Sequence, residues 1–194
     1  MNLDKVTDAA MRLNRVEPHL AMLVFLLERD IDNAMLSFGL FEAERSKTFT
    51  EKLNIRELMN HASCFVCAVR RVGRLFEKLV SQRSCLTPTV AKAVQLEWRK
   101  KKSFFDSFID PRNAIEHIDS EIDGKTFLRL FQLTNDRLEV TNGKSVTINR
   151  EAIAKLTESL DRIAEAILSG YPDPATVIVN AARTLSTTCS STAA

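Results

Sequence analysis

The feature that most constrains this chain is a set of long stretches with helical hydrophobic spacing and few residues that would interrupt them. Only 5 glycines and 5 prolines occur among 194 residues. In residues 18–46, 55–82 and 87–108, apolar side chains recur mostly at steps of three and four, which aligns them along one side of an α-helix. We therefore expect a mainly α-helical protein built on these segments. The first of them should bury Leu20, Leu23, Val24, Leu27, Ile31, Ala34, Met35 and Phe38.

β-structure is expected only in residues 125–149. Runs rich in β-branched and aromatic residues are separated there by Asn135-Asp136 and by Asn142-Gly143. Asn-Gly between two such runs is typical of a tight hairpin turn. We expect a small three-stranded meander.

The most regular amphipathic pattern follows at residues 150–170. Asn149 can cap its start, and Gly170 followed by Pro172 can end it. The whole pattern predicts one domain, residues 1–170, which is a helical bundle with a β insert before its last core helix. Residues 171–194 are expected to form a C-terminal tail that is partly flexible, because its last stretch, residues 184–194, is small and polar.

Composition narrows the classes of function only a little. A net charge of +2 permits a nucleic-acid partner without requiring one. The scattered glycines exclude a glycine-rich phosphate loop. The first 20 residues carry charges throughout, and the most apolar run, Leu20 to Leu27, is far shorter than the roughly 20 residues of a membrane span. With 4 cysteines and no sign of export, we expect a cytoplasmic protein with reduced thiols and no membrane partner.

A basic run at Arg99, Lys100, Lys101 and Lys102 is interleaved with aromatic residues. It has two interpretations. The run could follow an RNA backbone, or it could be a solvated helix face whose aromatic side chains turn into the core. The second interpretation is the more common one for such a run, and the first remains a candidate for weak RNA binding.

The histidines and cysteines elsewhere predict no metal site or cofactor. Cys64 and Cys67 form one C-x2-C pair, but no second pair completes a zinc site. The pair also lies inside a helical segment, so we expect both side chains to be small buried apolar groups. His19 and His61 are expected to serve structure.

The stretch "DPRNAIEHIDSEIDG" carries the most chemistry. Asp110 is a candidate N-cap for a helix that begins at Pro111. On that helix Asn113 and His117 lie one turn apart. Arginine grips phosphate with a forked donor, and histidine exchanges a proton near neutral pH. These residues suit a phosphodiester site on RNA, which brings its own 2′-hydroxyl nucleophile.

The same stretch also fits an ordinary surface helix. Arg112 and Glu116 stand four residues apart and could form a plain ion pair. His117 could be a solvated side chain.

The hexapeptide "RNAIEH", Arg112 to His117, resembles the R-x4–6-H motif of the HEPN superfamily (higher eukaryotes and prokaryotes nucleotide-binding), including the polar residue after the arginine. The longer phrase is similar to uncharacterised bacterial HEPN-like proteins that read RN-x-x-EH-x-D-x-E, which adds Glu116 and Asp119 as supporting residues. The resemblance covers about residues 17–170. It implies an all-α up-and-down bundle with the motif late in the chain, near a helix start.

The resemblance implies a function that involves RNA, a nucleotide or a partner protein. Many HEPN proteins are metal-independent endoribonucleases, including toxins and phage-defence factors, with a composite site at a homodimer interface. By that analogy His117 is the general acid or base, Arg112 stabilises the phosphate and Asn113 orients the site. Other branches are non-catalytic modules that bind RNA, a nucleotide or a protein. The partners implied are a second copy of the chain, an RNA substrate, and an antitoxin or regulatory protein.

Overall fold

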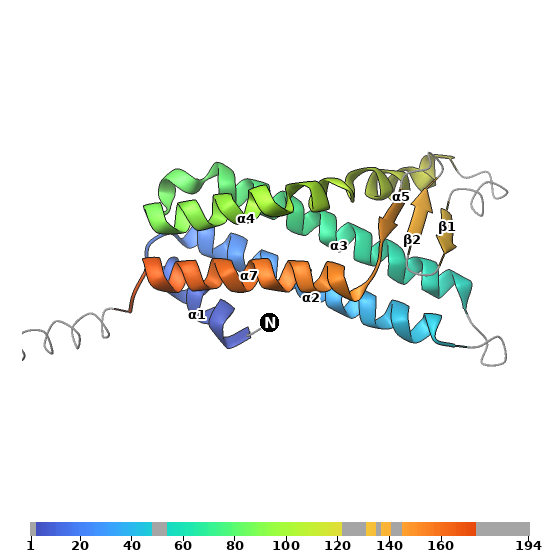
Figure 1. Cartoon of the computed structure of the whole chain (residues 1–194), viewed down its shortest axis with the longest axis horizontal. Helices are drawn as coiled ribbons and strands as arrows, with labels where there is room; N and C mark the ends of the chain where they lie inside the picture. The colour runs from blue at the N-terminus through green and yellow to red at the C-terminus, as the bar shows by residue number, and fades with distance from the viewer. Residues whose placement is uncertain (1–2, 48–53, 122–130, 135–136, 141–144, 174–194) are drawn as a thin grey trace, which may run out of the picture.

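The fold is an up-and-down bundle of long helices with a small sheet at one end (Figure 1). It is a computed structural model that describes residues 3–47, 54–121, 131–134, 137–140 and 145–173. Four helices run alternately along the long axis, and a fifth, α1, packs against α2 and α7. The mainly helical fold expected from the sequence is confirmed. These helices are α1 (Leu3–Asn14), α2 (Pro18–Arg45), α3 (Ile55–Ser81), α4 (Pro88–Asp106) and α7 (Arg150–Gly170).

Local chemistry fixes where the helices begin. Proline stands at the first position of α2 and of α4, where its missing N–H costs nothing. The Asn54 side chain accepts a hydrogen bond from Glu57 N at 3.2 Å at the start of α3. Asn149 accepts one from Ala152 N at 3.0 Å, so the predicted cap of α7 is confirmed.

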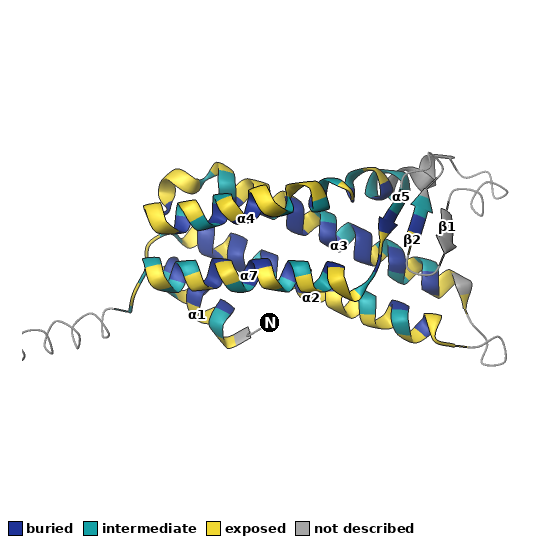
Figure 2. Ribbon diagram, in the orientation of Figure 1, coloured by how far each residue is buried: buried dark blue, intermediate teal, exposed yellow. Residues whose placement is uncertain are grey.

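Buried residues line the helices where they face one another (Figure 2), and several of the largest are aromatic. The ring of Phe76 on α3 lies 5.5 Å from that of Phe105 on α4. Gly73 makes this approach possible, because a Cβ added there would lie 3.0 Å from the Cβ of Phe105. Further along, Phe104 contacts Phe108, and Phe108 contacts a ring of α3. The core therefore continues to the end of α4, where the candidate site begins.

The β insert is a three-stranded antiparallel sheet in the order β1-β2-β3. Its strands are β1 (Phe131–Thr134), β2 (Arg137–Val140) and β3 (Ser145–Thr147). Leu138 of β2 pairs with Val146 of β3, and both side chains are buried. The predicted meander is confirmed, while its Asn142-Gly143 turn and the predicted tail from residue 174 lie outside the described residues.

Three details differ from the sequence-based expectations. Helix α1 was not expected as an element, although Val6, Ala9, Ala10 and Leu13 are fully buried along it. Met35 is 39% exposed, because it lies at the edge of the α2 stripe. Cys64 is exposed and Cys67 half-buried. The prediction that both are buried is wrong, since α3 turns the face containing Phe65, Val66 and Val69 inward instead.

Candidate functional site

The motif lies on α5 (Ile109–Glu121), which follows α4 after a short break at Ser107 and Phe108. Asp110 belongs to the first turn of α5, so the helix begins two residues earlier than the predicted start at Pro111. Phe108 anchors the junction. Its side chain is 1% exposed, and its carbonyl accepts a hydrogen bond from Arg112 N at 3.2 Å. The motif thus starts one helical turn beyond a fully buried side chain.

Arg112 and Asn113 contact each other directly. Arg112 Nη1 donates a hydrogen bond to Asn113 Oδ1 across 3.2 Å, and both residues are half-buried. The amide therefore holds one side of the guanidinium, which is consistent with an orienting role for Asn113.

His117 lies on the same helix, one turn after Asn113. Glu116 and Asp119 are also part of α5. The backbone therefore brings all the predicted motif residues onto one helix. The side chains of residues 116–121 lie outside what the structure describes, so the geometry around the imidazole stays a prediction.

A cavity of about 280 Å³ adjoins the junction between α4 and α5. It lies between the end of α4, strand β3 and the start of α7. Phe108 therefore both lines this cavity and anchors the helix that carries the motif. Further lining residues are Ser107, Ser145, Thr147, Asn149 and Lys155.

The charges around the cavity are largely compensated. Lys155 Nζ lies 2.7 Å from Glu151 Oε1 and 5.6 Å from the ring centre of Phe104. The hydrogen bond from Lys155 lowers the pKa of the Glu151 carboxyl. Hydroxyl groups of Ser107, Ser145 and Thr147 also line the cavity. Two of them already have partners, because Ser107 Oγ donates to Phe104 O at 2.6 Å and Ser145 Oγ accepts from Arg137 Nε. This lining suits a small polar molecule better than a strongly charged one.

The basic run on α4 is engaged in ion pairs. Lys101 Nζ lies 3.1 Å from Glu158 of α7, and Lys102 Nζ lies 2.9 Å from Asp106. Lys100 lies 3.1 Å from the buried carboxylate of Glu97. Arg99 is exposed. The Lys101 pair links α4 to α7, whereas the other two lie within α4. All three reduce the positive charge of the run. RNA binding by the run stays a prediction.

Two of the three neighbouring aromatic residues turn inward, as in the second interpretation of the run, and the third, Phe104, is half-buried. Trp98 is 8% exposed and Phe105 is fully buried. Neither ring is therefore open to stack on a base.

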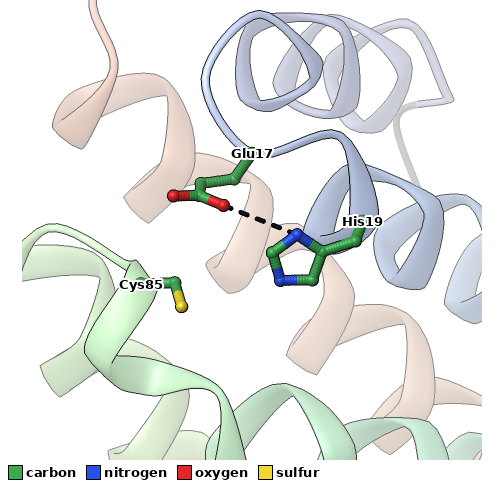
Figure 3. A group of neighbouring side chains, drawn as sticks. All are labelled: Glu17, His19 and Cys85. Carbon is green, nitrogen blue, oxygen red and sulfur yellow. Dashed lines mark ion pairs between the residues drawn. The ribbon is translucent and has the colours of Figure 1, made fainter.

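A second group of chemically active side chains was missed by the sequence analysis. Glu17, His19 and Cys85 meet at the other end of the bundle, with candidate ligand atoms within 4.8 Å of one another (Figure 3). Residues 19 and 85 are far apart in sequence, so no motif spacing could have revealed the group.

Comparison with protein-family models, curated proteins and solved structures finds no significant match to this chain. Among the described residues, none of the helices combines the length and apolarity that crossing a membrane would require.

Proposed function

We propose that this protein is a HEPN-type, metal-independent endoribonuclease, acting as a toxin or phage-defence factor, whose composite active site forms between two copies of the chain. The observation that carries the proposal is the placement of Arg112, Asn113 and His117 on one helix at the end of an up-and-down bundle. The resemblance implies this arrangement. The contact between Arg112 and Asn113 adds support, because it orients a phosphate-binding group on the helix that carries the histidine.

The proposed reaction begins when a base removes the proton of an RNA 2′-hydroxyl. The 2′-oxygen then forms a bond to phosphorus, the bond from phosphorus to the 5′-oxygen breaks, and the leaving oxygen takes up a proton. The products are a 2′,3′-cyclic phosphate and a 5′-hydroxyl. Arg112 stabilises the charge that builds up on the phosphate oxygens.

The proposed reaction explains why two copies of the chain are needed. One imidazole cannot accept the 2′-proton and protonate the leaving oxygen in the same step. Two facing copies of His117 supply one base and one acid. Neither Glu116 nor Asp119 is needed as a proton carrier, and both act as supporting residues on α5.

The test is a cleavage assay with purified protein, EDTA, total RNA and short end-labelled oligonucleotides. We expect products with cyclic-phosphate ends from the parent and from His61→Ala, which removes a half-buried histidine of α3. His117→Ala should cleave nothing while keeping its circular dichroism spectrum and its dimer mass. A single deoxynucleotide at the cleaved position should block the reaction. Equal cleavage by parent and His117→Ala would overturn the proposal.

A second candidate is a non-catalytic HEPN-like module that binds RNA, a nucleotide or a protein such as an antitoxin or regulatory partner. The ion pairs of Lys100, Lys101 and Lys102 favour the protein-binding form of this module, because they leave little unbalanced charge for an RNA strand along α4. A folded dimer that binds RNA or a partner protein without cleaving RNA would establish this alternative.

A further inference from the structure

Glu17 and His19 come from the start of α2, and Cys85 comes from the corner between α3 and α4, at the end of the bundle opposite the sheet (Figures 1 and 3). Glu17 precedes the first turn of α2, His19 lies within that turn, and Cys85 ends the short helix η2 (Arg83–Cys85) between α3 and α4. His19 Nδ1 lies 3.5 Å from Glu17 Oε2. Figure 3 shows the imidazole and the carboxylate directed toward each other, with the Cys85 side chain beside them.

We propose that these three side chains form a binding site for a divalent transition-metal ion, with Zn²⁺ as the best match. Thiolate, imidazole and carboxylate are the ligands that zinc takes in proteins, whereas Mg²⁺ and Ca²⁺ prefer oxygen alone. A thiolate and a carboxylate supply two negative charges that balance the ion. Three protein ligands leave the fourth tetrahedral position to water.

The distances are compatible with this ion after a small adjustment. Zinc–ligand bonds of about 2.0–2.3 Å place tetrahedral ligand atoms roughly 3.3–3.8 Å apart. The candidate atoms all lie within 4.8 Å, so closure requires a movement of about 1 Å, which side-chain rotation provides. The His19 side chain is 51% exposed, which leaves it room to rotate and leaves the site open to ions from solvent.

The backbone on the α2 side is already fixed. Glu17 N donates to Leu13 O at 2.7 Å, and Glu17 O accepts from Ala21 N at 3.1 Å. Pro18 restricts the backbone between the two ligand residues. Leu20, directly after His19, is fully buried. The two ligand residues are thus held close to each other without a metal.

The η2 side is fixed in a similar way. Cys85 N donates to Gln82 O at 3.1 Å, and the next residue, Leu86, is buried. Thr87 N donates to the hydroxyl of Tyr171 at 3.1 Å, which ties this corner to the end of α7. A metal ion here would bridge the α1–α2 turn to the α3–α4 corner. Since binding favours the folded chain, it should raise the melting temperature.

The test begins with metal-free protein titrated with Zn²⁺ by calorimetry, and with Co²⁺ followed by absorption. We expect one ion per chain, a rise in melting temperature, and a thiolate-to-Co²⁺ charge-transfer band. Cys85→Ser should lose that band. Cys85→Ser and His19→Gln should each weaken Zn²⁺ binding by at least about tenfold, the least that even outer-shell partners contribute.

Two matched controls distinguish Zn²⁺ binding at this site from nonspecific Zn²⁺ binding at other thiol or imidazole groups. Cys64→Ser removes an exposed thiol of α3, and His61→Gln removes another imidazole; both should bind Zn²⁺ like the parent. On the parent itself, Zn²⁺ should protect Cys85 but not Cys64 from alkylation, as read by peptide mass mapping. The proposal is overturned if Zn²⁺ fails to protect Cys85, or if the Cys85 and His19 variants bind as tightly as the parent.

Discussion

Glu97 of α4 is buried, and its Oε1 accepts a hydrogen bond from Arg162 Nη1 of α7 across 3.1 Å. The same oxygen also accepts one from Lys100 Nζ at 3.1 Å. The bond to Glu97 is the largest cause of a raised pKa of the Arg162 guanidinium. One buried carboxylate therefore accepts hydrogen bonds from two cationic side chains, one on α4 and one on α7, the two helices that also line the cavity.

Removing this carboxylate should destabilise the bundle. Glu97→Ala leaves the Arg162 and Lys100 donors without their shared acceptor, and we expect the free energy of unfolding to fall by about 1–3 kcal/mol. Urea unfolding followed by circular dichroism measures this. Glu158→Ala is the control, because Glu158 is an exposed partner of Lys101 and Arg162. If both variants lose the same free energy of unfolding, burial does not make the Glu97 carboxylate contribute more stability than an exposed one.

Gly73 and Gly39 should respond in opposite ways to alanine. A Cβ at residue 73 would lie 3.0 Å from Phe105 Cβ, and Phe105 is fully buried between Phe76 and Trp98. The ring cannot withdraw, so Gly73→Ala should cost about 1–3 kcal/mol through overpacking, less the gain in helix propensity. At Gly39 nothing lies within 4 Å, so Gly39→Ala should stabilise by about 0.5–1 kcal/mol. Thermal unfolding of the pair tests this, and equal shifts would contradict the close packing at Gly73.

Acid should weaken the fold through four carboxyl groups. The pKa values of Glu44, Glu151, Glu158 and Glu165 are lowered from 4.5, chiefly by hydrogen bonds from lysine side chains. A carboxyl whose pKa is lower in the folded state contributes its stability above the unfolded pKa and loses it as pH falls through the folded pKa. The melting temperature should therefore hold above pH 4.5 and fall below it.

Two variants sharpen this pH test. Glu165→Gln removes one of the four groups and should flatten the acid decline. Glu28 has the opposite sign, because burial, followed by the nearby Asp32 charge, raises its pKa. Glu28→Gln should therefore leave the decline below pH 4.5 intact or steepen it. A melting temperature that does not change between pH 7 and pH 3 would contradict the assignment.

Sequence patterns predicted the fold well where the signal is local. The α7 helix begins after the Asn149 cap and ends at Gly170 because capping and termination depend on neighbouring residues. Helix α1 carries an equally local signal in Val6, Ala9, Ala10 and Leu13.

The two candidate sites differ in the same way, because one depends on neighbouring residues and the other on tertiary packing. Arg112, Asn113 and His117 are close in sequence, so one helix suffices to bring them together. Cys85 meets His19 only after α2, α3 and η2 have packed, and no spacing rule encodes such a meeting. The exposure of Cys64 likewise depends on which face α3 presents to its neighbours, which helical spacing alone leaves open by a residue or two.

Substitutions of Arg112 test whether this side chain stabilises the phosphate during cleavage by the proposed ribonuclease. Arg112→Ala should lower the single-turnover cleavage rate by about 10²–10³-fold, the usual effect of losing one donor to a developing oxyanion. Arg112→Lys keeps the charge but loses the fork that Asn113 holds through the 3.2 Å hydrogen bond. Its rate should therefore lie between those of Arg112→Ala and the parent. Arg83→Lys, at an exposed position of η2, is the matched control and should cleave at the parent rate. Parent-like cleavage by Arg112→Lys would mean that positive charge alone is enough at this position, so that Asn113 has no orienting role. Parent-like cleavage by Arg112→Ala would remove the arginine from the site.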